Sequence, residues 1–182
     1  MSEELKGLLK QREDEKGRPL RSDALDGVKT VHACLLKKHE IVKQQQALME
    51  ALAPGLGPES EEPTEIVMAN LFGSLMDGSS QCFLCIADFE ERLERRPETV
   101  AVVCTSIRKD TITNQKTLLI YALSPFPTMD WTLCMNVFDT LKAFAKQAGC
   151  ARITGYSKMN EVVRMAQTFG ADTRWRLLSW EV

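Results

Sequence analysis

The sequence lacks the long apolar runs and the targeting pattern that would place a protein in or across a membrane. No window approaches the roughly eighteen uninterrupted apolar residues of a transmembrane helix. The first residues, Met-Ser-Glu-Glu-Leu-Lys, show no basic stretch followed by an apolar one, which is the layout of a secretory signal. We therefore expect a protein of the cytoplasm that has no membrane partner.

The chain also has little net charge. Its formal charge is −2 and its pI is about 5.8, so no global basic field recruits nucleic acid. A length of 182 residues with 44% apolar and 26% charged residues is typical of one well-packed domain with an extension. The segment Ala101–Val182 is mildly basic, with ten basic and six acidic residues. This balance suits an anionic ligand but is more typical of a solvated surface.

Six cysteines do not form the pattern of a disulfide framework, because they lie inside apolar runs. There a free cysteine behaves as a small apolar residue, which predicts a reducing environment. Cys82 and Cys85 have the spacing of a zinc knuckle but lie in a predicted strand, where alternate side chains diverge. No second ligand pair accompanies them, so we predict no metal site.

The N-terminal third reads as a helical arm. Ser22 or Asp23 is a suitable N-cap for a helix that runs to about Ala53, where the sequence Pro-Gly-Leu-Gly-Pro stops it. The predicted division is an arm over residues 1–58, a linker over 59–63 and a domain over 64–182. An approximate heptad stripe on the arm suggests partner contacts through Val28, Val31, Leu35, Val42, Met49 and Leu52. The arm either folds back onto its own domain or docks on another subunit.

Residues 64–182 alternate between helical and strand patterns. Helices are predicted over 64–76, 130–148 and 160–169, with Gly78 and Gly149 ending the first two. Strands are predicted over 81–87, 100–108, 117–123, 151–156 and 174–180, and the polar stretch Lys109–Lys116 predicts a hairpin turn. The expected fold is α/β, a mixed and mainly antiparallel sheet flanked by helices.

This order of elements resembles the GNAT-type N-acetyltransferase superfamily over residues 64–182. The resemblance rests on the helix before Gly78, the strand from Gln81 to Ile86, and the run from Phe144 to Cys150. The Phe169-Gly170 pair stands where the superfamily commonly has Gly-Phe. The nearest likeness is to short acetyltransferase-like proteins of tailed phages, which implies a virion as a second location.

The resemblance also implies a glycine-rich turn for the pyrophosphate of coenzyme A, and this chain departs from it. The corresponding residues are Ser124, Pro125, Phe126, Pro127 and Thr128, without glycine or a basic side chain. Proline has no N–H to donate, and Asp130 would repel phosphate. The superfamily's acid and base groups have only weak counterparts in Tyr156 and Glu98. We assign no catalytic or cofactor-binding residue with certainty.

The sequence leaves three functions open. The preferred one is a non-catalytic structural or interaction protein that needs no cofactor and assembles, as a homo-oligomer or with virion proteins, through its arm. The alternative is an active acetyl-CoA-dependent N-acetyltransferase with a divergent cofactor loop. The third is a nucleic-acid-associated factor with a basic surface formed by Arg152, Lys158, Arg164, Arg174 and Arg176.

Overall fold

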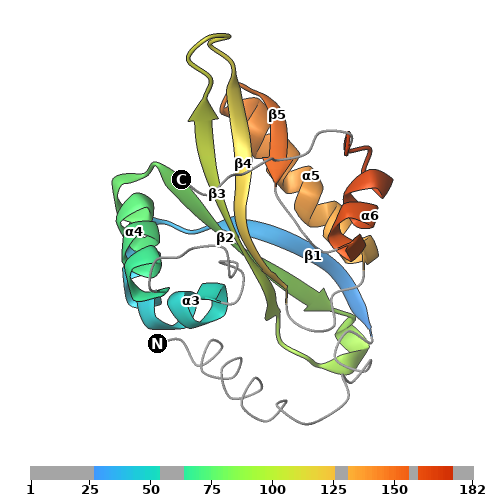
Figure 1. Cartoon of the computed structure of the whole chain (residues 1–182). Coiled ribbons are helices and arrows are strands. Elements are labelled where there is room, and N and C mark those ends of the chain that lie inside the picture. Colours follow the sequence, from blue (N-terminus) through green and yellow to red (C-terminus); the bar gives the residue numbers. More distant parts are fainter. Residues whose placement is uncertain (1–26, 54–63, 126–130, 156–159, 174–182) are drawn as a thin grey trace.

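Five strands form one curved, mainly antiparallel sheet at the centre of the computed structural model, which describes residues 27–53, 64–125, 131–155 and 160–173. Their spatial order equals their order in the chain: β1 (Val28–Leu35), β2 (Ser80–Phe89), β3 (Glu98–Lys109), β4 (Lys116–Pro125) and β5 (Cys150–Gly155). The first four are antiparallel neighbours, and β5 joins β4 in parallel (Figure 1).

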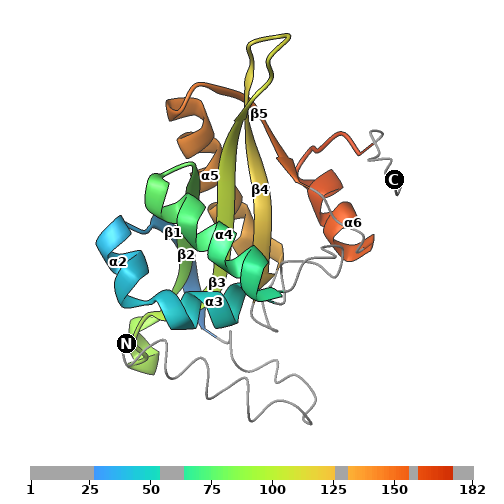
Figure 2. The same cartoon turned by 60° about the vertical axis from the view of Figure 1, so that its left-hand side comes forward.

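Helices cover both faces of the sheet. On one face lie α2 (Lys38–Lys43), α3 (Gln45–Leu52) and α4 (Thr64–Asp77), and the long helix α5 (Trp131–Gln147) lies on the other. The helix α6 (Asn160–Thr168) follows β5, and a short 3-10 turn, η3 (Glu91–Leu93), connects β2 to β3. Figure 2 shows α3 and α4 in front of the strands and α5 behind them.

The core divides into two apolar clusters because consecutive side chains of a strand point to opposite faces. In β2, Cys82 and Leu84 pack against α3 and α4, while Phe83 and Cys85 pack on the side of α5. This two-sided burial explains why β2 reads as a continuous apolar run rather than as an alternating one. It also confirms that Cys82 and Cys85 diverge.

Two glycines end helices as predicted. Gly78 has φ +89° directly after α4, and Gly149 has φ +72° shortly after α5. Such left-handed residues release the chain from a helix, and glycine adopts them without the steric cost of a Cβ. Asp77 supports the first turn, because its Oδ1 accepts a hydrogen bond from the backbone N–H of Ser79 at 2.7 Å.

The prediction of one helix from Ser22 or Asp23 to Ala53 is wrong for residues 28–35, which form β1. This strand pairs with β2 along its whole length, from Val28 opposite Phe89 to Leu35 opposite Phe83. The β-branched residues of Val28–Val31 favour an extended backbone, and tertiary pairing outweighs the helical spacing of the apolar residues. Only α2 and α3 preserve the predicted helix, with a break at Gln44.

The proposed partner-binding stripe is consequently not one exposed face. Val31 is buried on the α5 side of the sheet, and Leu52 is buried on the α3 side. Val28 and Met49 are partly buried against these same two clusters. Only Leu35 and Val42 are about half exposed. Residues 28–53 thus contribute to the sheet and core, and the predicted linker lies outside the described residues.

Candidate active site

The candidate site is the place where β4 separates from β5. The two strands pair in parallel from Lys116 opposite Cys150 to Ile120 opposite Gly155, where β5 ends. Beyond this point β4 continues to Pro125, still paired with β3. We call the β5-facing side of Tyr121–Pro125 the open edge, because no described strand pairs with it. The two strands diverge in Figure 2.

A β-bulge marks the start of the open edge. On β3, Cys104 and Thr105 are consecutive, but their partners on β4 are Ala122 and Ile120, so Tyr121 is one residue extra. A bulge of this kind increases the local twist and redirects a side chain. Tyr121 is 47% exposed, whereas Ala122 beside it is buried.

The bulge also determines to which face of the sheet each side chain of the open edge points. After it, Ala122 packs on the face of α3 and α4, and Leu123 packs on the face of α5. Ser124, next in the alternation, is 3% exposed. The two hydroxyl groups of the open edge therefore differ: that of Tyr121 is on a half-exposed side chain, and that of Ser124 is on a buried one.

Helix α5 places its N-terminal end near the end of β4. Its C-terminal end lies at the start of β4, since the Nζ of Lys116 donates to the carbonyl of Ala148 at 3.4 Å. The helix therefore runs opposite to β4, and its first residue, Trp131, is at the same end of the sheet as Pro125. The first turn has no acidic residue, and Asp130 directly precedes it in the sequence. Helix N-termini carry free N–H groups and partial positive charge, so the backbone of this turn is suited to an anion while the charge of Asp130 opposes one.

The structure locates the sequence-predicted site residues unevenly. Ser124 and Pro125 are the last residues of β4, whereas Phe126, Pro127, Thr128 and Tyr156 lie outside the described residues. Glu98 begins β3 at the same end of the sheet as Pro125, because β4 ends opposite Ala101. Its Oε1 accepts a hydrogen bond from Arg95 at 3.0 Å, and this guanidinium lies 3.8 Å from the ring centroid of Phe89.

The sequence pattern alone does not single out Tyr121. Tyr156 draws notice because it ends a predicted strand, and residues 117–123 read as a regular strand. A signal is nevertheless present, because a single polar aromatic residue interrupts the apolar run between Leu118 and Leu123.

Three of the cysteines, Cys82, Cys85 and Cys104, are buried in the core. Cys82 and Cys104 are buried and directly opposed on β2 and β3. Their thiol hydrogen bond, together with burial, raises the pKa of the Cys104 thiol far above its ordinary value. Among the described residues, no group of three His, Cys, Asp or Glu side chains is placed to hold a metal ion. In the same part of the chain, no helix combines the length and apolarity needed to span a bilayer.

Solved structures that are similar to this chain include several acetyltransferases. An acetyltransferase from Trypanosoma brucei is 12% identical with a TM-score of 0.54, over 84% of this chain and 99% of that one. A ribosomal-protein-alanine N-acetyltransferase from Brucella melitensis biovar Abortus 2308 is 13% identical with a TM-score of 0.58, over 84% and 100%. An aminoglycoside N-acetyltransferase in complex with CoA is 12% identical with a TM-score of 0.59, over 84% and 94%.

Neither a protein-family model nor a curated protein matches the sequence. The likeness to the solved structures is therefore one of fold. It confirms the predicted GNAT-type fold, and it extends over β1, α2 and α3 because the aligned part exceeds four-fifths of the chain. These neighbours give no support to a relation with phage proteins.

Proposed function

We propose that this chain is an N-acyltransferase that takes its acyl group from acetyl-CoA or a related acyl-CoA. The observation that carries the proposal is the open edge of β4, which begins at a bulge and ends near the start of α5. Its support from the comparisons is that structures with this fold are acetyltransferases, one of them in complex with CoA.

The open edge suits the extended, amide-containing arm of coenzyme A. A strand without a neighbour presents backbone N–H and C=O groups at regular spacing, and an extended ligand can pair with them as an added strand would. The thioester supplies an activated acyl group. Backbone N–H groups next to the bulge are suited to stabilise the negative charge that develops on its carbonyl oxygen when an amine attacks.

We assign Tyr121 the role of a hydrogen-bond donor at the point of divergence. The amine nitrogen gains the acyl carbon and loses a proton to solvent water, the C–S bond breaks, and the sulfur leaves as a thiolate that needs a proton or a strong donor. A phenol is suited to supply it. Tyr121 qualifies because the bulge places it at the start of the open edge with an accessible side chain.

The phosphate groups of the cofactor would be held weakly. Pro125 and Pro127 provide no N–H donors, so the first turn of α5 remains as the main source of backbone donors. We therefore expect binding to depend on the pantetheine arm more than on the nucleotide. Removing the nucleotide part of the ligand should weaken binding by about tenfold or less.

Calorimetric titration with acetyl-CoA tests the proposal, with S-acetyl-pantetheine as the shorter ligand. The variant Gly155→Leu places a side chain where β5 ends, and it should abolish binding of both. A Cβ at this position meets Ile120 at 3.7 Å, an ordinary contact that the fold tolerates. Gly73→Leu on α4 is the matched control, because no atom lies within 4 Å of a Cβ there.

Acetyl-CoA binding that Gly155→Leu leaves intact would refute the assignment of the open edge. Absence of any binding by the native chain would refute the acyltransferase itself. That result would favour the non-catalytic interaction role. Of the six residues of the predicted partner-binding stripe, Leu35 and Val42 are the ones exposed enough to contact a partner.

A further inference from the structure

The opposite end of β4 carries a feature that the acyltransferase does not use. The β3–β4 hairpin extends beyond the rest of the sheet, as Figures 1 and 2 show. Its turn is well defined: Oδ1 of Asp110 accepts hydrogen bonds from the N–H groups of Ile112 at 2.9 Å and Thr113 at 2.7 Å. Asn114 completes the turn with φ +59°.

Four exposed cations surround the base of this hairpin: Arg108, Lys109, Lys116 and Arg152. Lys109 and Lys116 are directly opposite each other on β3 and β4, an arrangement of like charges that destabilises a sheet. None of the four forms an ion pair of 4 Å or less with a described residue, and Arg152 acts on Asp110 only at longer range. Asp110, the one acid of the turn, directs its carboxylate to the backbone.

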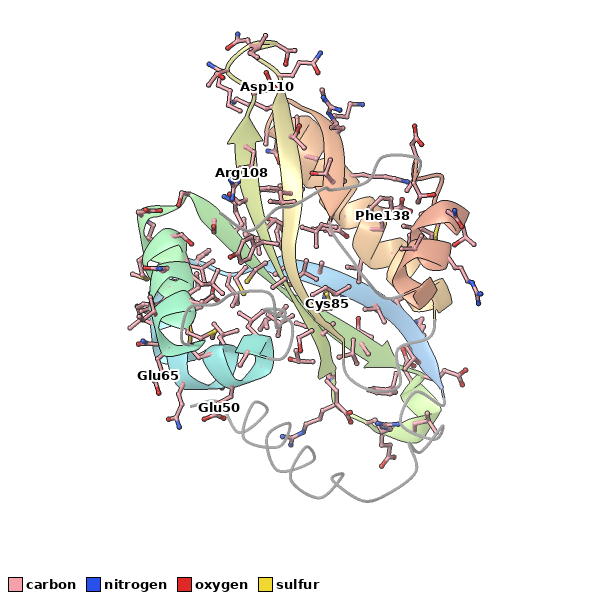
Figure 3. The ribbon with its side chains drawn as sticks, viewed as in Figure 1. Glu50, Glu65, Cys85, Arg108, Asp110 and Phe138 are labelled. Carbon is pink, nitrogen blue, oxygen red and sulfur yellow. The ribbon has the colours of Figure 1, made fainter. Side chains whose placement is uncertain are left out.

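The cations lie on both faces of the hairpin. Thr117 on β4 pairs with Arg108 on β3 and with Arg152 on β5, so these three side chains point to the same face of the sheet. It is the face covered by α4, because Cys104, an even number of residues before Arg108 on β3, packs there. Lys109 and Lys116 belong to the other face, where Lys116 reaches the end of α5. Figure 3 shows Arg108 on the arm of the hairpin and Asp110 toward its tip.

We propose that this hairpin binds duplex DNA by entering its major groove. The major groove admits a two-stranded β-ribbon, and a phosphate backbone then flanks each side of the ribbon. Cations on both faces match that geometry, whereas the flat surface of an acidic protein would meet only one face. The tip has uncharged hydrogen-bonding side chains suited to base edges, Thr111, Thr113, Asn114 and Gln115, and Ile112, which is 94% exposed.

The charges at the two ends of the sheet favour this orientation. The hairpin end carries four cations and one acid, Asp110, which is a net charge of +3. At the other end, the connection from β2 to the start of β3 has a net charge of −1, from Glu90, Glu91, Glu94 and Glu98 against Arg92, Arg95 and Arg96. Phosphate backbones therefore attract the hairpin end, so a chain with a formal charge of −2 approaches DNA hairpin first.

Fluorescence anisotropy with a labelled 20-base-pair duplex of mixed sequence tests the proposal on the full chain. About four phosphate contacts predict that affinity falls about 100-fold between 50 and 200 mM salt. The double variant Lys109→Gln/Lys116→Gln should weaken binding and lower the salt slope by about two. The matched control is Lys29→Gln/Lys43→Gln, which has the same net charge change on β1 and α2 and should bind as the native chain does.

Two further measurements test whether the hairpin itself binds the duplex. Acetyl-CoA binding should be the same in all these variants, because the hairpin is at the far end of β4 from the open edge. A single strand of the same sequence should bind more weakly than the duplex. The proposal is overturned if the single strand binds as tightly, if both double variants lose affinity equally, or if no salt-dependent binding occurs at 50 mM salt.

Discussion

The two ends of β4 show how one strand can present two different surfaces. From Lys116 to Ile120 the strand has neighbours on both sides, so its backbone groups are used in pairing and it presents only side chains, beginning with the exposed Lys116 at the hairpin. From Tyr121 to Pro125 it has a described neighbour on one side only, and its backbone becomes the distinctive feature. The bulge at Tyr121 separates the two regions.

Deleting Tyr121 should have the largest effect, and the effect should be on ligand binding. Without the extra residue, Ile120 and Ala122 become consecutive opposite Thr105 and Cys104, so β4 pairs regularly with β3 and the other side chains keep their faces. We expect the free energy of unfolding, measured by urea denaturation, to change by about 1 kcal/mol or less, and acetyl-CoA binding at the open edge to be lost. Deleting Asn114 from the exposed hairpin turn is the control and should leave that binding intact. Acetyl-CoA binding that survives the deletion of Tyr121 would mean that the bulge is not required.

The substitution Tyr121→Phe tests the chemistry of the open edge while preserving the bulge. If the hydroxyl assists the departing thiolate, kcat falls about 100-fold and KM stays near its native value. Tyr156→Phe is the matched control, since these are the only two tyrosines of the chain. A larger loss in Tyr156→Phe would return the role to the residue that the sequence suggested.

The hydrogen bond between Thr105 and Gln81, next to the bulge, offers a test with a smaller expected effect. The fully buried Thr105 donates a hydrogen bond from its hydroxyl to Oε1 of Gln81 at 3.1 Å, which joins β3 to β2. Thr105→Val preserves shape and removes the donor, so we expect a loss of about 1 kcal/mol in unfolding free energy. Thr117→Val, at a half-buried position of β4, should be close to neutral. A neutral Thr105→Val would show that the hydrogen bond contributes nothing net.

Sequence patterns predicted the elements that local signals define. Gly78 and Gly149 end their helices because a left-handed residue is needed there, and the polar stretch around Asp110 turns because its carboxylate binds the backbone. Both signals act within a few residues. The fold class followed from the order of such elements.

The missed features depend on neighbours that are distant in sequence. Residues 28–35 have apolar spacing that also suits a helix, and pairing with β2, about fifty residues later, makes them a strand. The bulge at Tyr121 exists only relative to β3, and the open edge exists only because β5 ends at Gly155. The candidate site thus depends on the register in which β4 pairs with β3 and β5. This register cannot be read from a single sequence.

Protonation of Asp110 should have the smallest effect of these changes, because it should alter only the turn of the β3–β4 hairpin. Hydrogen bonds from Thr113 and then Ile112 lower the pKa of this carboxyl. A lowered pKa means that the carboxylate stabilises the turn at all higher pH values and that this contribution is lost as pH falls through the folded-state pKa. The amide resonances of Ile112 and Thr113 should therefore stay constant from pH 7 to about pH 5 and shift together below the ordinary range of an aspartate. In Asp110→Asn that joint shift should vanish, while the resonances of Ala122 and Leu123 at the open edge remain unchanged in both proteins. A titration that moved the open-edge resonances as well would mean that the two ends of β4 are coupled rather than independent.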